Sequence, residues 1–517
     1  MNAMKTRICR VGLVAGLLAV LCLPAISAEQ RPVFNVRAFG AAGDARTKDT
    51  AAIAKAIETC DKAGGGTVYF PPGKYLTGAI RLKSRVTLEI EAGAVILGSR
   101  DPQDYPAVPS PWEDGRREIS ALIYADGASD ITIKGRGVID GQGEVWWQRQ
   151  RLANPKGQGR PLTAEEQKEA AMVKLGRPHL VKLVRSNNIL MEGLTLVNSP
   201  SWTVNPVFCE FVTIRGLTLI NPPDSPNTDG INPESCRNVH ISNCHIDVGD
   251  DCVTLKSGKD EAGRRAGRPT ENVTVTNCTM IHGHGGIVIG SEMSGDVRNV
   301  TVANCVFQQT LRGIRIKSQR GRGGVVEGLT ASNIVMEDVS EPFSITMYYS
   351  GRAGEDRTEP VGEGTPAFRD ILLSNIFARG ARIAGQILGL PEMPISGVSL
   401  SNVRVSAKQG FEARWAKDLA FHNVQIDTEK GPALLCRNVE GLEIDGFRSL
   451  RPHARVPVIA LGDVQQGFLR GCWAARGTDV FLDAGGDKSR NIVLVGNELQ
   501  SAKEAVAAPP GLVTVRP

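Results

Sequence analysis

Short segments in which apolar and polar residues alternate recur along the chain, and each ends at an asparagine or a glycine. Four of them end at Asn243, Asn277, Asn304 and Asn333, and Gly216 occupies the same place one repeat earlier. The steps between these five positions are 27, 34, 27 and 29 residues. Alternation with a period of two is typical of β-strands. A repeat of this length predicts a solenoid whose turns stack on one another.

The same pattern continues towards the C-terminus at Asn375, Asn402 and Asn423, and in degraded form at Gly446 and Gly496. The chain holds 57 glycines and little helical periodicity, which indicates several short strands per turn joined by tight corners. We therefore predict an all-β fold, a right-handed parallel β-helix, in a single domain that follows residue 28. Leucine is not periodic enough for a leucine-rich array, and no propeller blade signature occurs.

Residues 49–63 show helical spacing instead. Ile53, Ile57 and Cys60 share one face, and Asp49 is a candidate N-cap. Because a solenoid exposes its core at each end, we predict that this helix caps the N-terminal end.

The first 28 residues have the pattern of a signal peptide. Cations at positions 5, 7 and 10 precede an apolar run, and the residues that follow suit cleavage after Ser27 or after Ala28. Cys22 would suit a lipoprotein, but the leucine before it is not a small residue. No later apolar stretch approaches the ~20 residues of a membrane-spanning helix. We expect an exported protein, periplasmic or extracellular, with no membrane anchor.

Charge and cysteine usage narrow the function classes. Removal of the signal peptide takes three of the 60 lysines and arginines and none of the 55 carboxylates, so the remaining chain is almost neutral. That balance argues against a nucleic-acid partner. Cys244, Cys278 and Cys305 each follow the asparagine of a repeat, which predicts stacked, buried thiols and no disulfide framework. No metal-ligand spacing accompanies them, so we expect no metal. We also expect no cofactor and a monomeric protein.

Four short polar motifs lie at matching points of consecutive repeats, in turns that span about residues 199–350. Stacked strands lie ~4.8 Å apart, so the side chains of these motifs should converge on one stripe. The first two motifs supply carboxylates, the third an imidazole and the fourth two cations. They are Asn227-Thr228-Asp229-Gly230, Gly249-Asp250-Asp251, Gly283-His284-Gly285 and Arg315-Ile316-Lys317.

Alternation supports this convergence. Arg315 and Lys317 are two residues apart and should leave one face of a strand, and Asn227 and Asp229 share that relationship. Carboxylates this close repel one another, which should raise the pKa of at least one of them. A protonated carboxyl beside ionised carboxylates is what glycoside hydrolysis requires.

Each motif also has an ordinary interpretation. Asn-Thr-Asp-Gly is commonly a turn, Asp-Asp a solvated corner, His284 a loop histidine and Arg-x-Lys a solvated face. Their coincidence in four adjacent turns favours an active site over four independent surface features.

With these motifs the chain resembles the polygalacturonases, the family 28 glycoside hydrolases, over nearly the whole length that follows the signal peptide. All four motifs match the family pattern. The resemblance implies a right-handed parallel β-helix and metal-free, inverting hydrolysis of α-1,4 bonds between galacturonates of an acidic polysaccharide. It implies Asp250 as the general acid and Asp229 and Asp251 as the residues that hold and activate water. His284 would orient or tune the acid.

The resemblance further implies that Arg315 and Lys317 bind the carboxylates of the substrate, which suits an anionic sugar held beside acidic side chains. Asn227 is an additional candidate substrate contact. The next turn adds Tyr348 or Tyr349, of which alternation allows only one to face outward. Weaker candidates are Trp202, His282 and Asn205.

Three other functions share part of this pattern. A pectate lyase on the same architecture would hold Ca²⁺ and use an arginine as base, whereas here the cations accompany a carboxylate triad and a histidine. Rhamnogalacturonan hydrolases resemble this family but depart at one of the paired acids and at the histidine. A non-catalytic polysaccharide-binding β-helix would not need acid, water-holding residues and cations together.

Residues 144–177 form the longest interruption of the pattern, with Trp146, Trp147 and many charges. We interpret them as an inserted loop with some helix. Because one turn of a β-helix advances only ~4.8 Å, such a loop would reach across two turns and close one end of a groove near Asp229. That placement favours exo over endo action. The alternative is that the insertion packs on the flank and buries its two tryptophans.

Overall fold

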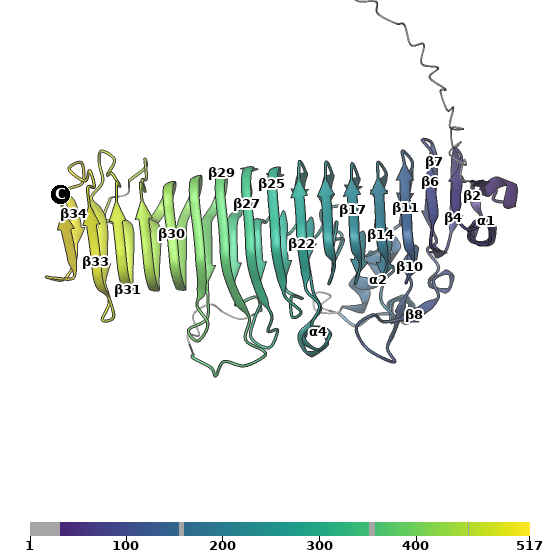
Figure 1. The fold of residues 1–517 in the computed structure, drawn as a ribbon, viewed down its shortest axis with the longest axis horizontal. Helices are drawn as coiled ribbons and strands as arrows, with labels where there is room; N and C mark the ends of the chain where they lie inside the picture. The colour runs from purple at the N-terminus through teal and green to yellow at the C-terminus, as the bar shows by residue number, and fades with distance from the viewer. Residues whose placement is uncertain (1–31, 155–159, 351–356, 453) are drawn as a thin grey trace, which may run out of the picture. The chain divides into compact units, whose positions relative to one another are not determined.

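The computed structural model describes residues 32–517 except 155–159, 351–356 and 453. The proposed signal peptide, residues 1–28, lies outside the described residues. Pro32–Pro517 form one compact unit in which nearly all strands pair in parallel with a strand of the next turn (Figure 1). This topology confirms the right-handed parallel β-helix. Within the described residues, no helix is both long enough and apolar enough to cross a membrane.

Each turn contributes strands to three parallel stacks, which we call stacks A, B and C. Stack A contains β1 (Val33–Asn35), β3 (Gly66–Phe70), β6 (Val86–Ile90), β11 (Ser129–Gly135), β14 (Asn187–Glu192), β17 (Glu210–Arg215), β19 (Arg237–Ser242) and β22 (Thr270–Thr276). Stack B contains β2 (Asp44–Lys48), β4 (Gly73–Thr77), β7 (Ala94–Gly98), β12 (Val138–Asp140), β15 (Thr195–Val197), β18 (Thr218–Ile220), β20 (His245–Val248) and β23 (Thr279–His282).

Stack C begins with β5 (Ile80–Arg81), β10 (Ile123–Asp126), β13 (Val181–Val184) and β16 (Val204–Val207) and continues with β21 (Val253–Leu255), β24 (Ile287–Gly290), β26 (Arg312–Lys317) and β28 (Glu341–Thr346). Ile231 joins its two halves because it pairs with both Val204 and Val253. Longer strands continue around the corners in later turns. They are β25 (Val297–Gln308), β27 (Val325–Glu337), β29 (Ala367–Leu388), β30 (Ile395–Asp445) and β31 (Pro457–Arg470), followed by β32 (Val480–Gly485), β33 (Arg490–Val495), β34 (Glu504–Ala507) and β35 (Val513–Arg516).

The repeated asparagine has a backbone reason. It stands where the chain turns from stack A to stack B in a left-handed conformation, with φ between 50° and 58° from Asn243 to Asn423. Glycine and asparagine adopt this region most readily, which explains why Gly216 replaces asparagine there. In later turns the side-chain amides also bond to each other, as when Asn423 Nδ2 donates to Asn402 Oδ1 at 2.8 Å. The repeat therefore marks a corner.

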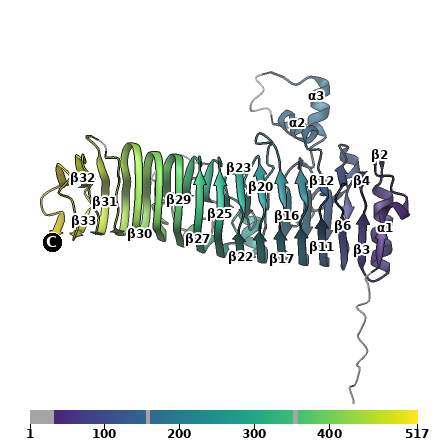
Figure 2. The same ribbon diagram turned by 90° about the horizontal axis from the view of Figure 1, so that it is seen from above.

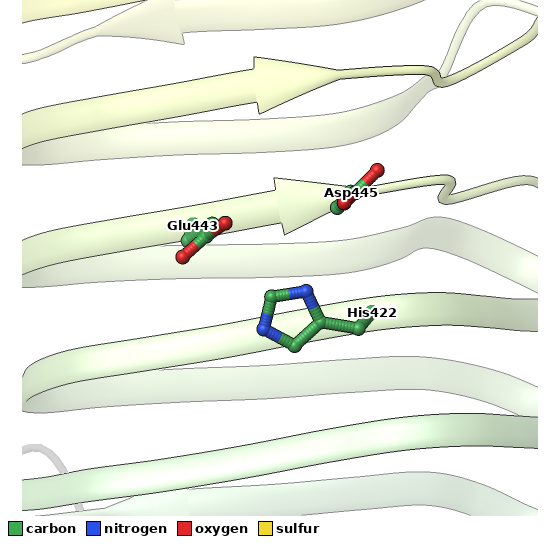
Figure 3. Close-up of side chains that lie close together, drawn as sticks. All are labelled: His422, Glu443 and Asp445. Atoms are coloured by element: carbon green, nitrogen blue, oxygen red, sulfur yellow. The ribbon is translucent and has the colours of Figure 1, made fainter.

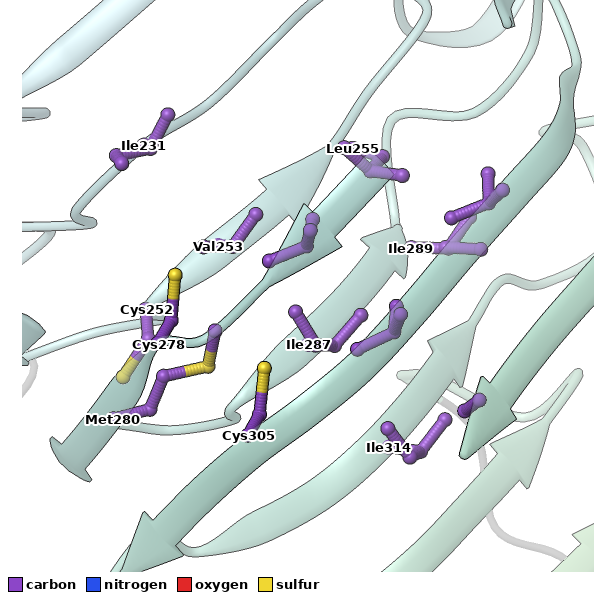
Figure 4. Close-up of a cluster of buried hydrophobic side chains, with 14 of the residues drawn as sticks. Ile231, Cys252, Val253, Leu255, Cys278, Met280, Ile287, Ile289, Cys305 and Ile314 are labelled. Carbon is purple, nitrogen blue, oxygen red and sulfur yellow. The ribbon is translucent and has the colours of Figure 1, made fainter. Parts of the chain in front are cut away.

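The core is a continuous column of aliphatic, aromatic and sulfur-containing side chains between the stacks. All nine cysteines of the described residues are buried and none forms a disulfide there, which confirms the prediction of buried thiols. Cys252, Cys278 and Cys305 lie among isoleucines, Val253 and Leu255 in this column (Figure 4).

One α-helix and two short 3-10 helices lie near the N-terminal end of the described solenoid. The predicted cap is α1 (Thr50–Lys62), whose Ile53, Ile57 and Cys60 are buried. Asp49 precedes it but makes no side-chain cap; its carboxylate accepts the backbone N–H groups of residues 42 and 43 instead. The prediction that Asp49 caps the helix was wrong. Its carboxylate is bonded to the backbone N–H groups of the preceding loop and does not reach those of the first helical turn. Short 3-10 helices are η1 (Val36–Phe39) and η2 (Pro102–Asp104).

The insertion of residues 144–177 contains α2 (Glu144–Ala153) and α3 (Ala164–Ala171), which project from the side of the row of strands (Figure 2). Trp146 is fully buried and Trp147 is 5% exposed. Trp147 Nε1 donates to Ser199 O at 2.9 Å. The insertion thus anchors itself on the flank through its two tryptophans.

A second excursion was not anticipated as a separate element. It is the antiparallel hairpin of β8 (Ala107–Pro109) and β9 (Arg117–Ile119). α4 (Asp260–Ala266) follows β21, and it lines the same cavity as this hairpin.

Candidate active site

The four motifs lie in one column along stack C. Ile231, Val253, Ile287 and Ile314 follow one another in parallel register on successive turns. Asp229 immediately precedes the first of these turns, Asp250 and Asp251 precede β21, and His284 precedes β24. Arg315 and Lys317 lie within β26, and Ile316 between them is buried in the core. The register therefore brings together the side chains that the sequence pattern selected.

The three carboxyl groups converge. Asp229, Asp250 and Asp251 each offer an oxygen within 4.8 Å of the others. Asp229 and Asp251 are 3% and 1% exposed, so neither carboxyl is screened by bulk water. Asn232 Nδ2 donates to Asp229 Oδ2 at 3.0 Å. Asp250 Oδ1 accepts the backbone N–H of Asp251 at 2.9 Å and lies 3.0 Å from His284 Nδ1.

The pKa values of these carboxyl groups diverge. Burial and the nearby Asp250 raise the pKa of Asp229 to about 8. Burial opposes ionisation of Asp250 too, but the hydrogen bond and charge of His284 outweigh it and lower the pKa of Asp250. The same hydrogen bond raises the pKa of His284. The expectation of at least one raised carboxyl pKa is met at Asp229 and not at Asp250, whose lowered pKa and the raised pKa of His284 both favour a carboxylate paired with an imidazolium.

Two cations border Asp251. Lys317 Nζ lies 2.7 Å from Asp251 Oδ2, and Arg315 Nη1 lies 3.5 Å from Asp251 Oδ1. Tyr349 is 43% exposed, and its ring centroid lies 5.3 Å from Lys317 Nζ and 5.8 Å from the guanidinium carbon of Arg315. Tyr348 is partly buried and packs against the core. Tyr349 is therefore the residue of this pair that lies exposed beside Arg315 and Lys317.

Asn227 reaches the site in a different way from the one predicted. It is not in a strand and has φ 54°, so the alternation argument that paired it with Asp229 does not apply. Its Oδ1 accepts a hydrogen bond from Arg177 Nη2 at 2.8 Å. Arg177 Nη1 also donates to Pro200 O and Pro226 O, and burial lowers the pKa of this guanidinium to about 10. Arg177 thus holds the turn that carries Asp229.

Sequence reasoning missed a second buried cation. Lys256, at the end of β21, lies 2.9 Å from Glu292 Oε2 and 3.9 Å from Asp229 Oδ2. Its Nζ is 4.5 Å from the centroid of the Trp202 ring, which places the weak candidate Trp202 beside the carboxylates. The signal available in the sequence was a lysine that closes the apolar segment directly after the paired aspartates.

The two other weak candidates do not join the carboxylates. His282 Nδ1 lies 2.7 Å from Asp247 Oδ1 on stack B. Asn205 is 1% exposed, and its Nδ2 donates to Asn232 O. Asn205 supports the residue that holds Asp229, and it offers no surface to a substrate.

A cavity of about 690 Å³ shares Trp202 with the surroundings of the carboxylates, although Asp229, Asp250 and Asp251 do not line it. Trp202 and Glu234 line it from the solenoid, the β8–β9 hairpin lines one side and α4 with its preceding residue lines another. The ring of Trp112, in the hairpin, lies 4.6 Å from that of Phe208, between centroids, and packs on Gly258. Val108 packs against Tyr124 and Val184, so the hairpin lies over β10 and β13, and its tip reaches the corners that follow β16 and β21.

Comparison with known proteins agrees with this geometry. Residues 74–416 match the model of the glycosyl hydrolases family 28. The chain belongs to this family. A probable polygalacturonase of Vitis vinifera is 36% identical over 378 residues, which are 71% of this chain and 73% of the relative. The first residues of the solenoid, 33–92, also match a model described as rhamnogalacturonase A/epimerase, pectate lyase-like.

Relatives of both cleavage modes occur in family 28. The crystal structure of a hyperthermoactive exopolygalacturonase from Thermotoga maritima is 32% identical, with a TM-score of 0.64, and the match covers 76% of this chain and 92% of that one. An endo-polygalacturonase of Pectobacterium carotovorum subsp. carotovorum is 28% identical over 77% of this chain and 95% of the relative. Family membership therefore establishes a glycoside hydrolase and leaves the cleavage mode to the geometry of this chain.

Proposed function

We propose that this family 28 hydrolase cleaves α-1,4-galacturonosyl bonds of polygalacturonate. The observation that carries the proposal is the cationic border of the carboxylate cluster, where Arg315 and Lys317 flank Asp251 at 3.5 and 2.7 Å. An anionic sugar approaching three carboxylates needs cations to offset the repulsion, and a guanidinium matches a carboxylate with two parallel donors. Tyr349 adds an exposed ring above both cations.

In this proposal Asp250 protonates the leaving oxygen. Because the pKa of Asp250 is lowered and that of His284 is raised, the proton is held on His284 and passes through Asp250, 3.0 Å away, to the leaving oxygen; uptake of a proton from solvent restores the pair. Asp251, which has the closest cations, activates water. Asp229 holds the water and supports this role once it is ionised.

Stereochemistry is a separate part of the proposal. The carboxyl oxygens lie within 4.8 Å of one another, closer than the ~6.5–9.5 Å between carboxyl groups that is typical of inverting enzymes. The inverting outcome that we propose is thus supported by the resemblance to the family and not by this spacing. Proton NMR of the first anomer released from an oligogalacturonide checks it; the retained α-anomer would contradict inversion.

Product analysis tests the substrate assignment. Purified protein is incubated with polygalacturonate and, separately, with rhamnogalacturonan, and reducing ends are followed together with absorbance in the near ultraviolet. We expect reducing ends from polygalacturonate without new absorbance. Unsaturated products would show a lyase, and cleavage of rhamnogalacturonan alone would show the neighbouring hydrolase activity.

We also propose exo action, for a different reason from the one that the sequence suggested. The insertion 144–177 packs on the flank, and none of its described residues lines the cavity beside the carboxylates. The β8–β9 hairpin does line it, and Glu118 in β9 is ion-paired with the buried Lys182 in β13. A hairpin tied down across stack C would admit a chain end and exclude a chain middle.

The test compares two shortened proteins. Replacement of residues 110–116 by a tight turn removes the hairpin tip, and deletion of residues 160–172 removes α3 as a matched control. We expect the wild type and the control to release short products with a slow fall in viscosity, and the hairpin variant to lower viscosity rapidly while few bonds are cut. A rapid viscosity drop with the wild-type protein would show endo action.

Export and a monomeric state complete the proposal. Fractionation of expressing cells, with mass spectrometry of the mature N-terminus, tests cleavage after Ser27 or Ala28. Light scattering of the purified protein tests the monomer. Retention in the cytoplasm or a stable dimer would contradict the respective part.

A further inference from the structure

We propose that Lys256 is a positioning residue that makes Asp229 able to ionise during catalysis, and that Glu292 sets how strongly it does so. Lys256 Nζ lies 3.9 Å from Asp229 Oδ2 and 2.9 Å from Glu292 Oε2, so the ammonium group stands between two carboxylates and closer to Glu292. The Lys256 side chain is 5% exposed, which leaves water little room to screen either interaction.

The shape of the site fixes this ammonium group. Its carbon stem leaves the end of β21, and the nitrogen lies 4.5 Å from the Trp202 ring centroid. The backbone N–H of Lys256 donates to Pro233 O, and residue 256 pairs with Glu234 of the preceding turn. Lys256 is thereby tied to the turn that carries Asp229, and a change in its charge acts on that carboxyl directly.

Other charged groups around Asp229 act in known directions. Asp250 and Asp251 oppose its ionisation, and Lys317 favours it from the far side of the cluster. Arg177, which donates to Asn227 in the turn that carries Asp229, is also close enough for its positive charge to interact with the Asp229 carboxylate. Lys317, however, is already bonded to Asp251 at 2.7 Å. Lys256 is paired with Asp229 at 3.9 Å, but its hydrogen bond goes to Glu292, which lies outside the catalytic set.

Further charges bear on Lys256 itself. The carboxyl of Glu234, in the preceding turn, is buried, and burial raises its pKa to about 7 despite the nearby Lys182 and Lys256. His179 is buried against Trp202, and burial together with the neighbouring cations lowers its pKa. His179 therefore adds little positive charge near neutral pH, whereas Glu234 ionises above about pH 7 and then joins Glu292 and Asp229 as a carboxylate near Lys256.

This inference rests on the proposed function, in which Asp229 must be ionised to hold the attacking water. The two partners of Lys256 then predict opposite effects. Lys256→Met removes the cation and should raise the pKa of Asp229. Glu292→Gln keeps the shape but frees the ammonium group to bond Asp229, and should lower that pKa. If Lys256 and Glu292 only stabilised the fold, both variants would lose activity, and the pKa of Asp229 would not shift in opposite directions.

The first measurement is the pH dependence of kcat, whose acidic limb reports the group that must be ionised. We expect Lys256→Met to move the acidic limb to higher pH by about one unit or more, which at lower pH is a loss of about tenfold or more. Glu292→Gln should move it to lower pH. Arg149→Met is the matched control, because Arg149 is also buried and paired with a glutamate, Glu169 of the flanking insertion, and should leave the limb in place.

The second measurement does not depend on activity. Thermal unfolding at pH 8 of wild type, Lys256→Met, Asp229→Asn and the double variant forms a mutant cycle. We expect the loss of Tm caused by Lys256→Met to be clearly smaller when Asn replaces Asp229. An additive cycle, or limbs that move in the same direction in both variants, would overturn the inference. A wild type that leaves polygalacturonate intact would instead refute the proposed function, while the cycle would still report the coupling.

Discussion

Among the described residues, two clusters of three acidic or imidazole side chains lie close enough together to hold a metal ion, and each is formed by the stacking of adjacent turns. The first consists of Asp229, Asp250 and Asp251. The second, in the C-terminal turns, consists of His422, Glu443 and Asp445 (Figure 3). In both clusters the ligand-type atoms lie within 4.8 Å of one another. By proximity alone they are equivalent.

Their surroundings are different. Asp229 and Asp251 are buried, and the charge of Asp251 is balanced by buried or nearly buried cations. Asp445 is 35% exposed in its side chain and lies 2.8 Å from Arg470, which is 49% exposed. Stacking brings carboxylates together wherever acidic residues recur in register. Burial beneath flanking loops is what turns such a cluster into a reactive one, because it removes the screening by water.

The strongest test of this difference is the removal of one carboxylate from each cluster. Asp250→Asn should lower kcat by about 10²–10⁴-fold, because it removes the carboxylate that delivers the proton to the leaving oxygen. Asp445→Asn, with the same change on the same scaffold, should leave kcat within about twofold. Steady-state kinetics on polygalacturonate measures both. If Asp250→Asn retains more than half of the wild-type kcat, Asp250 is not the acid.

A pH-dependent effect on stability should follow from burial. The pKa of Asp229 is raised from 3.8 to about 8 in the fold. Its contribution to stability is therefore present below the unfolded pKa and is lost as the pH rises from about 4 through about 8, by roughly 6 kcal/mol at most. Asp229→Asn cannot ionise and should lose less stability over that range. Denaturant unfolding at pH 5 and pH 8 measures the slope, and equal slopes in both proteins would contradict the raised pKa.

Breaking one ion pair in each cluster should sharpen the contrast. Lys317→Ala leaves the buried Asp251 without its closest cation, so we expect a loss of about 3–5 kcal/mol of unfolding free energy and a higher KM for the anionic substrate. Arg470→Ala breaks an exposed pair and should cost about 0–1 kcal/mol without changing KM. Equal losses in the two variants would show that burial does not separate the clusters.

The smallest effect is expected from metal removal. Both clusters have the side chains of a metal site, but Lys317 stands at 2.7 Å from Asp251 and Arg470 at 2.8 Å from Asp445, where a cation already compensates the charge. Chelator should therefore change neither activity nor Tm, and added Ca²⁺ should restore nothing. Loss of activity in chelator, together with unsaturated products, would indicate a lyase.

The pattern of the sequence was sufficient for the solenoid and for the column of motifs. The left-handed corner favours asparagine or glycine, and alternation separates core from surface. Parallel stacking then places equivalent positions of successive turns side by side. These are local rules that repeat, so the convergence of Asp229, Asp250, His284 and Lys317 followed from spacing alone.

Only the tertiary structure decided what surrounds that column. Arg177 bonds to Asn227 across 50 residues of sequence. Trp112 of the β8–β9 hairpin packs against Phe208, which is even further away in the sequence. Alternation could not choose between Tyr348 and Tyr349 because the choice depends on how the chain leaves β28. Burial of Lys256, and with it the charge state of Asp229, depends on side chains from several turns at once, and no local pattern encodes that environment.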